Sequence, residues 1–162
     1  MRRTLGLTVV LTLGLAGGVL ADPLENTTPP DPPTAADFEA QRAFDEGTRH
    51  MKAKRYAEAV AAFQQAVKAR PDFAEAHSNL GYSLRNTGRL DQAIAAYREA
   101  IRLKPDLVEA HEYLGVAYLL KGDRQAAMEE YRILQRLSPK LAAELLEEIE
   151  KGGEKAGTPR RW

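Results

Sequence analysis

The sequence predicts an all-α protein: a right-handed α-solenoid of three helix-turn-helix units, followed by a C-terminal capping helix. The first observation is a recurring proline. Pro71, Pro105 and Pro139 stand 34 residues apart, and each follows a helix-like stretch. Proline lacks a backbone N–H and clashes with the preceding turn, so a proline at this step ends a helix at the same point of a recurring unit.

The second observation is that other residue types keep the same step. They are Gly47, Gly81 and Gly115, then Ala59, Ala93 and Ala127, and the aromatic residues Phe63, Tyr97 and Tyr131. Small residues alternating with large ones at fixed offsets indicate two helices in close contact. Aligned on the prolines, the units are 40–73, 74–107 and 108–141.

Each unit contains a turn between its two helices. Gly88 and Gly122 can adopt the left-handed conformation that ends a helix. In the first unit this place holds Lys54. Lysine in that conformation costs about 1 kcal/mol where glycine would not, so we expect the first turn to be built differently.

Two glycines fall inside the predicted first helices. Gly81 and Gly115 lie mid-helix, where glycine costs about 1 kcal/mol relative to alanine. We expect that the facing helix, through Ala93 or Ala127, comes too close to admit a side chain.

The two ends of the array are predicted to be helical. Ala35–Ala53 is expected to form one long first helix, with Asp37 as its N-cap. After Pro139, a capping helix is expected over 140–151, because a terminal repeat needs a cover with a polar outer face. Its apolar residues Leu141, Leu145 and Ile149 would face inward, and Glu144, Glu147, Glu148 and Glu150 would face outward.

The first 21 residues have the pattern of a signal peptide. Arg2 and Arg3 precede an uncharged stretch from Leu5 to Leu20, and we expect cleavage after Ala21. This predicts a periplasmic or secreted protein without a membrane span after cleavage. An uncleaved leader that anchors the N-terminus in the membrane is the alternative. Residues 22–35 are predicted to be a proline-rich acidic linker, and 152–162 a flexible tail.

Composition and motifs exclude several classes of function. The formal net charge is zero, which argues against a nucleic-acid binder. There is no cysteine, and no histidine lies three or four residues from another histidine, as in a helical zinc site. His77 and His111 hold the same place in successive units, which favours packing over metal binding. No cofactor or phosphate loop is predicted, and no arrangement of residues indicates an enzyme.

The repeating residues resemble the tetratricopeptide repeat. The second unit matches with Leu80, Gly81, Ala93, Tyr97, Ala100 and Pro105, and the third with Leu114, Gly115, Tyr118, Ala127, Tyr131 and Pro139. The first unit is weaker, because Ala43, Glu46 and His50 depart from the family pattern. The resemblance covers residues 40–141.

This resemblance implies a concave groove, lined by the first helices, that binds a partner peptide. At the positions equivalent to the family's groove positions, this sequence has Phe44, Thr48, Met51, Asn79, Tyr82, Asn86, Tyr113, Val116 and Leu120. Some family members clamp a partner's C-terminal carboxylate with basic residues and asparagines. Only Asn79 matches that set, because Phe44, Thr48, Glu109 and Tyr113 fill the other places. We therefore expect apolar anchors in the ligand.

The resulting expectation is an exported, non-catalytic helical-repeat adaptor whose ligand is a protein or peptide. Two alternatives stay open. One is a structural protein that self-assembles into homo-oligomers through its exposed first-helix surfaces. The other is an accessory subunit of an envelope enzyme whose chemistry lies in another chain.

Overall fold

The computed structural model describes residues 32–152, and these residues form helices without strands. From Pro33 on they belong to one compact unit. The helices are α1 (Ala35–Lys52), α2 (Tyr56–Ala69), α3 (Ala74–Asn86), α4 (Leu90–Leu103), α5 (Val108–Leu120), α6 (Arg124–Leu137) and α7 (Pro139–Glu150). The predicted signal peptide, nearly all of the predicted linker and the tail beyond Gly152 lie outside the described residues.

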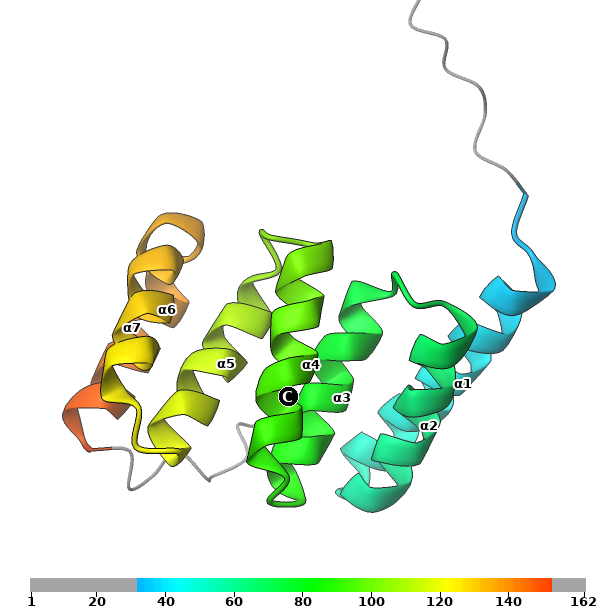
Figure 1. The fold of residues 1–162 in the computed structure, drawn as a ribbon, viewed down its shortest axis with the longest axis horizontal. Coiled ribbons are helices and arrows are strands. Elements are labelled where there is room, and N and C mark those ends of the chain that lie inside the picture. The colour runs from blue at the N-terminus through cyan, green and yellow to red at the C-terminus, as the bar shows by residue number, and fades with distance from the viewer. Residues whose placement is uncertain (1–31, 153–162) are drawn as a thin grey trace, which may run out of the picture. The chain divides into compact units, whose positions relative to one another are not determined.

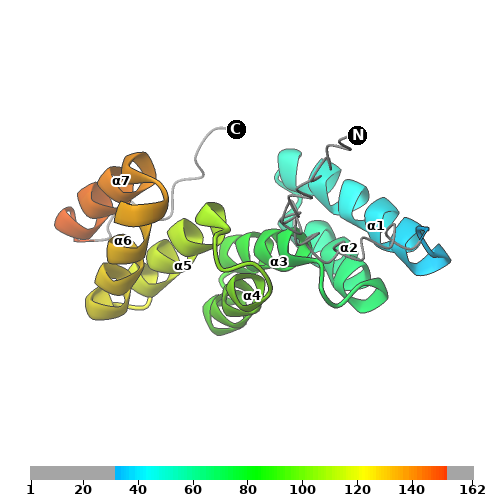
Figure 2. The same cartoon turned by 90° about the horizontal axis from the view of Figure 1, so that it is seen from above.

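The helices stack as successive antiparallel pairs, α1 with α2, α3 with α4 and α5 with α6 (Figure 1). The first helices α1, α3 and α5 also contact one another in order along the array, whereas α2, α4 and α6 do not. The first helices therefore line the inner side of the stack (Figure 2). The predicted all-α solenoid of three helix pairs with a capping helix is confirmed.

The turns inside the three units share one backbone conformation. Lys54 has φ 58°, and the equivalent Gly88 and Gly122 have φ 78° and 80°. The expectation of a differently built first turn was therefore wrong. The closing hydrogen bonds of the turn, such as that from the N–H of Arg55 to the carbonyl of His50, hold Lys54 in the left-handed conformation.

Helix α1 begins one residue after Thr34. The hydroxyl of Thr34 accepts a hydrogen bond from the N–H of Asp37, and the Asp37 carboxylate accepts one from the N–H of Thr34. This reciprocal pair is a capping box. Asp37 is thus the third residue of the helix, and the prediction that it is the N-cap was wrong.

The mid-helix glycines make room for rings from the second helix of the same pair. A Cβ atom on Gly47 would lie 2.7 Å from the ring of Phe63, and one on Gly81 would lie 2.7 Å from Tyr97. Ring atoms, not the predicted alanine at position 93, therefore set the requirement for glycine. Both rings are fully buried.

The third unit differs because α7 inserts a side chain into it. A Cβ atom on Gly115 would lie 2.6 Å from Leu145 of α7, so that leucine fills the notch instead of the predicted Ala127. Tyr131, which follows the same 34-residue step as Phe63 and Tyr97, is only half-buried. Leu145 and Ile149 form the buried face of the cap.

The outer face of α1 carries charge where the inner units carry small or apolar residues. Arg42, Glu46 and Arg49 are exposed, whereas the equivalent Ala76, Leu80 and Ser83 of α3 are buried. No described residue packs on this face from a preceding unit. The departure of unit one from the repeat pattern at Glu46 is therefore one expected of a terminal repeat.

No helix among the described residues has the length and apolar character needed to cross a bilayer.

Candidate functional site

The inner side of the stack is the surface where the sequence places the groove. The structure buries three of its nine predicted residues, since Met51, Tyr82 and Val116 are only 4%, 3% and 5% exposed. The side chains of these three pack between helices. Phe44, Thr48, Asn79, Asn86 and Tyr113 are half-buried, and Leu120 is exposed.

Two of the half-buried polar side chains bond to their own helix. The Thr48 hydroxyl donates to the carbonyl of Phe44 at 2.9 Å, and the Asn86 amide donates to the carbonyl of Tyr82 at 2.8 Å. Asn79 differs from both. Its side-chain amide has no hydrogen bond to any residue within 32–152, although its backbone carbonyl accepts from the hydroxyl of Ser83.

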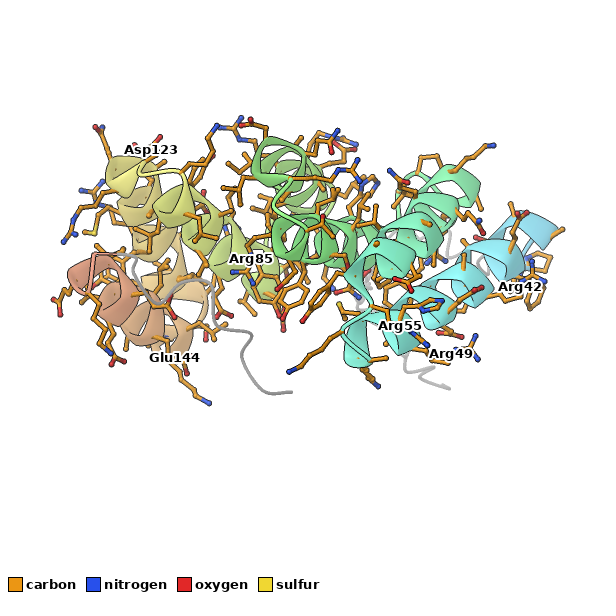
Figure 3. The ribbon with its side chains drawn as sticks, turned by 90° about the horizontal axis from the view of Figure 1, so that it is seen from below. Arg42, Arg49, Arg55, Arg85, Asp123 and Glu144 are labelled. Atoms are coloured by element: carbon orange, nitrogen blue, oxygen red, sulfur yellow. The ribbon has the colours of Figure 1, made fainter. Side chains whose placement is uncertain are left out.

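Tyrosine rings form the middle of the inner side. The ring of Tyr82 lies 5.3 Å from that of Tyr113 and 6.2 Å from that of Tyr56, measured between centroids. The Arg85 guanidinium carbon lies 5.1 Å from the centroid of the Tyr82 ring and 6.0 Å from that of Tyr113. Figure 3 shows Arg85 near the middle of the array. Such stacked rings and a cation over their faces make a stiff wall.

Burial shifts these tyrosines further toward the neutral form. It raises the pKa of Tyr82, to which the neighbouring Tyr56 adds, and it raises the pKa of Tyr113, to which Glu112 adds. Their hydroxyl groups therefore act as hydrogen-bonding phenols at any physiological pH.

A pocket of about 360 Å³ opens where α3 and α5 begin. Its lining residues are Phe44, Glu75, Ser78, Asn79, Lys104, Leu107 and Glu109. Phe44 is held in place by two rings, since its centroid lies 4.8 Å from that of Phe73 and 5.7 Å from that of Phe63. The pocket thus combines an aromatic floor, an unbonded amide and charged groups.

A smaller pocket of about 290 Å³ lies at the opposite ends of the same helices. Its lining residues are Arg85, Asn86, Gly88, Leu90 and Leu120. Four of the six accessible residues of the predicted groove therefore line one of these two pockets. Phe44 and Asn79 line the larger pocket, here called the first-turn pocket because it opens at the first turns of α3 and α5, and Asn86 and Leu120 line the smaller one.

Comparison with known proteins gives the family. The sequence matches the family model described as Tetratricopeptide repeat over residues 44–108 and 83–142. The chain belongs to the tetratricopeptide repeat family. No curated protein sequence matches this tetratricopeptide repeat chain.

Several solved tetratricopeptide repeat structures share the fold. The Arabidopsis OM64 domain is 19% identical with TM-score 0.67, and the match covers 70% of this chain and 96% of that one. The second domain of human RPAP3, solved in complex with an HSP70 peptide, is 20% identical with TM-score 0.67, covering 71% and 98%. The TPR2B domain of yeast Sti1, solved as an Hsp70 complex, is 23% identical with TM-score 0.64, covering 76% and 99%.

Sequence reasoning missed four lining residues of the first-turn pocket. Glu75 and Ser78 lie on α3, whereas Lys104 and Leu107 come from the connection between α4 and α5. Family places were assigned along the first helices only, so the connecting segment received no role. The position of Lys104 directly before the repeating Pro105 was a signal that could have found it.

Two histidines of this tetratricopeptide repeat domain, His77 and His111, bond backbone carbonyls. Nε2 of His77 bonds the carbonyl of Pro71 at 2.9 Å, and Nε2 of His111 bonds that of Pro105 at 3.0 Å. Each histidine thus ties a first helix to the proline that precedes it. Within residues 32–152, no three side chains that ligate metals come together.

Proposed function

We propose that this tetratricopeptide repeat protein is a non-catalytic adaptor that binds another protein or peptide on its inner side. The observation that supports this most is the first-turn pocket. The Asn79 amide faces a concave space beside the Phe44 ring and has no bond to the described part of the chain. An amide in this position can bond the backbone of an extended peptide whose side chains contact the aromatic floor.

The peptide complexes of related domains support the same proposal. The first repeat domain of Spaghetti was solved with an HSP90 peptide, and the TPR2B domain of yeast Sti1 was solved as an Hsp70 complex. Our chain has Phe44, Thr48, Glu109 and Tyr113 at places where the carboxylate-clamping members carry basic residues or asparagine. We therefore propose that its ligand is held by side-chain anchors and not by a C-terminal carboxylate.

We further propose that the protein acts outside the cytoplasm. The basic start, uncharged stretch and small residues that end at Ala21 support export with cleavage at that point. N-terminal sequencing of the protein from its native host tests this. A mature chain that begins at Asp22 is expected, and a chain that retains Met1 in the membrane fraction would favour the anchored alternative.

Photo-crosslinking tests the adaptor function directly. A photoreactive phenylalanine analogue is placed on the inner side at the exposed Glu109 or Leu120, or on the second helices at the exposed Lys68 or Gln125. We expect the first pair to capture one discrete partner in cells and the second pair to capture none. Equal capture from both surfaces, or capture from the second helices alone, would contradict the proposal.

A further inference from the structure

We infer that the first-turn pocket selects a peptide in which an apolar side chain is flanked by positive charge, an inference that rests on the proposed function. The pocket lined by Phe44, Glu75, Ser78, Asn79, Lys104, Leu107 and Glu109 combines an apolar floor with two carboxylates and one lysine.

The floor can hold one aliphatic or aromatic side chain. Phe44 is fixed by contacts with Phe63 and Phe73, and Leu107, which also lines the pocket, is only 8% exposed. Because the floor is already packed, a ligand side chain gains apolar contact without ordering the pocket first. Asn79 beside it offers both a donor and an acceptor to the ligand backbone.

The charges around the pocket are mainly negative. Nζ of Lys104 lies 3.0 Å from the carboxylate of Glu75, and the carboxylates of Asp106 and Glu109 lie near enough to raise the pKa of Lys104 further. The hydrogen bond to Glu75 and the attraction of its charge are the largest causes of that raised pKa. One lysine therefore stands among three carboxylates.

The other positive charges near the pocket are an arginine that is paired with an aspartate and the partial charges of two helix N-termini. Arg70 lies 3.8 Å from the carboxylate of Asp37 and stacks over the Phe73 ring at 3.6 Å. The N-termini of α3 and α5 contribute roughly half a unit charge each, which fades within a turn. Together they offset about one of the two carboxylates that Lys104 leaves unpaired, so the rim retains a net negative charge.

Glu109 is the carboxylate best placed to meet a ligand. It is exposed, lies in the first turn of α5 and lines the pocket. A lysine or arginine next to the anchoring side chain of a ligand would reach it. An acidic ligand would meet Glu75, Asp106 and Glu109 and would be disfavoured by the same charges.

Three labelled nonapeptides test this selectivity by fluorescence anisotropy with the folded chain. One alternates leucine with lysine, one alternates leucine with glutamate, and one alternates leucine with glutamine. We expect the lysine peptide to bind tightest at low salt and to weaken as salt rises, because exposed charges are screened. Glu109→Gln should weaken binding of the lysine peptide about two- to fivefold, which is the effect expected from the loss of one exposed ion pair.

Charge reversal and a matched control complete the test. Glu109→Lys should weaken the lysine peptide further and strengthen the glutamate peptide, whereas Glu129→Gln, at an exposed position on α6, should change neither. Circular dichroism of each variant verifies that the helices are retained.

The outcomes separate the two proposals. If the glutamate or glutamine peptide binds as tightly as the lysine peptide, or if both Glu109 variants leave lysine-peptide binding unchanged, the charge inference is overturned while groove binding stands. If none of the three peptides binds, the charge inference is overturned. The adaptor function is then judged by crosslinking at position 120, which keeps Glu109 in place, and failure to capture a partner there would overturn it separately.

Discussion

Lys54 and Gly88 hold equivalent places in successive units and share a left-handed backbone, with φ 58° and 78°. A residue with a Cβ atom is strained in this conformation by roughly 1–2 kcal/mol, and glycine is not. Lys54→Gly should therefore raise the free energy of unfolding by about 1 kcal/mol, after allowance for the greater freedom of glycine in the unfolded chain. Urea denaturation measures it.

The reciprocal change at Gly88 provides the control. A Cβ atom there would meet nothing within 4 Å, so only the backbone is tested. Gly88→Ala should destabilise by about 1 kcal/mol. If Lys54→Gly lowers stability while Gly88→Ala leaves it unchanged, the shared conformation is not what governs these turns.

The notches at Gly81 and Gly115 should respond differently to one methyl group. At Gly81 the methyl would meet the rigid, fully buried ring of Tyr97, so Gly81→Ala should destabilise by about 1–3 kcal/mol. At Gly115 it would meet the end of the more flexible Leu145 side chain, so Gly115→Ala should cost less. Thermal unfolding compares the two. An equal or reversed order would contradict the packing described here.

The pair of His111 and Glu130 should make stability depend on pH. Nδ1 of the buried His111 lies 2.7 Å from the Glu130 carboxylate, and Nε2 faces the Pro105 carbonyl. Burial lowers the pKa of His111, but the bonds to Glu130 and Pro105 outweigh it, and the pKa is raised above its ordinary value of 6.5. Both neighbours are acceptors, so the doubly protonated ring satisfies both.

The sign of this dependence follows from the raised pKa. The stabilisation that the His111–Glu130 pair gives the folded state is complete below about pH 6.5. It is lost as pH rises through the pKa of His111 in the folded state. Urea denaturation at several pH values should show the free energy of unfolding fall across this window, and His111→Gln should flatten the fall. His77→Gln is the control, because His77 has alanine at position 96 where His111 has Glu130. A fall that persists unchanged in His111→Gln would contradict this role.

The repeat period predicted the positions of the helix pairs because one proline and one glycine per unit recur at a fixed step. It failed where an added element changes the packing. Leu145 takes the place beside Gly115 because α7 follows α6 after Ser138 alone, and no earlier unit has this connection. The hydrogen bond of Thr34 with Asp37 was missed because the period begins after it.

The groove was predicted less completely than the fold. The period places Tyr82 and Val116 on the first helices, but it does not say how deeply neighbouring helices cover them, and both are buried. Phe44 and Asn79 stayed accessible because they line the pocket that opens where α3 and α5 begin. Lys104 was missed because it lies in the segment between α4 and α5. The 34-residue repeat pattern does not predict the direction of a side chain there.

The charged outer face of α1 should keep the chain from stacking end to end. The variant Arg42→Ala, Glu46→Leu, Arg49→Ser gives this face the residues that α3 buries at equivalent places. It exposes an apolar face, so we expect self-association that the original chain lacks at the same concentration. Light scattering measures it. If the original chain already forms oligomers and the variant forms no more, these charges do not limit assembly.

The most direct test of a binding site on the inner side is amide chemical-shift mapping by NMR. The labelled chain is titrated with the leucine-lysine peptide or with the crosslinked partner once identified. We predict that the shifts concentrate in the first two turns of α3 and α5, around Asn79 and Glu109. Shifts confined to the exposed faces of α2, α4 and α6, for example at Lys68 and Gln125, would contradict a ligand site on the inner side.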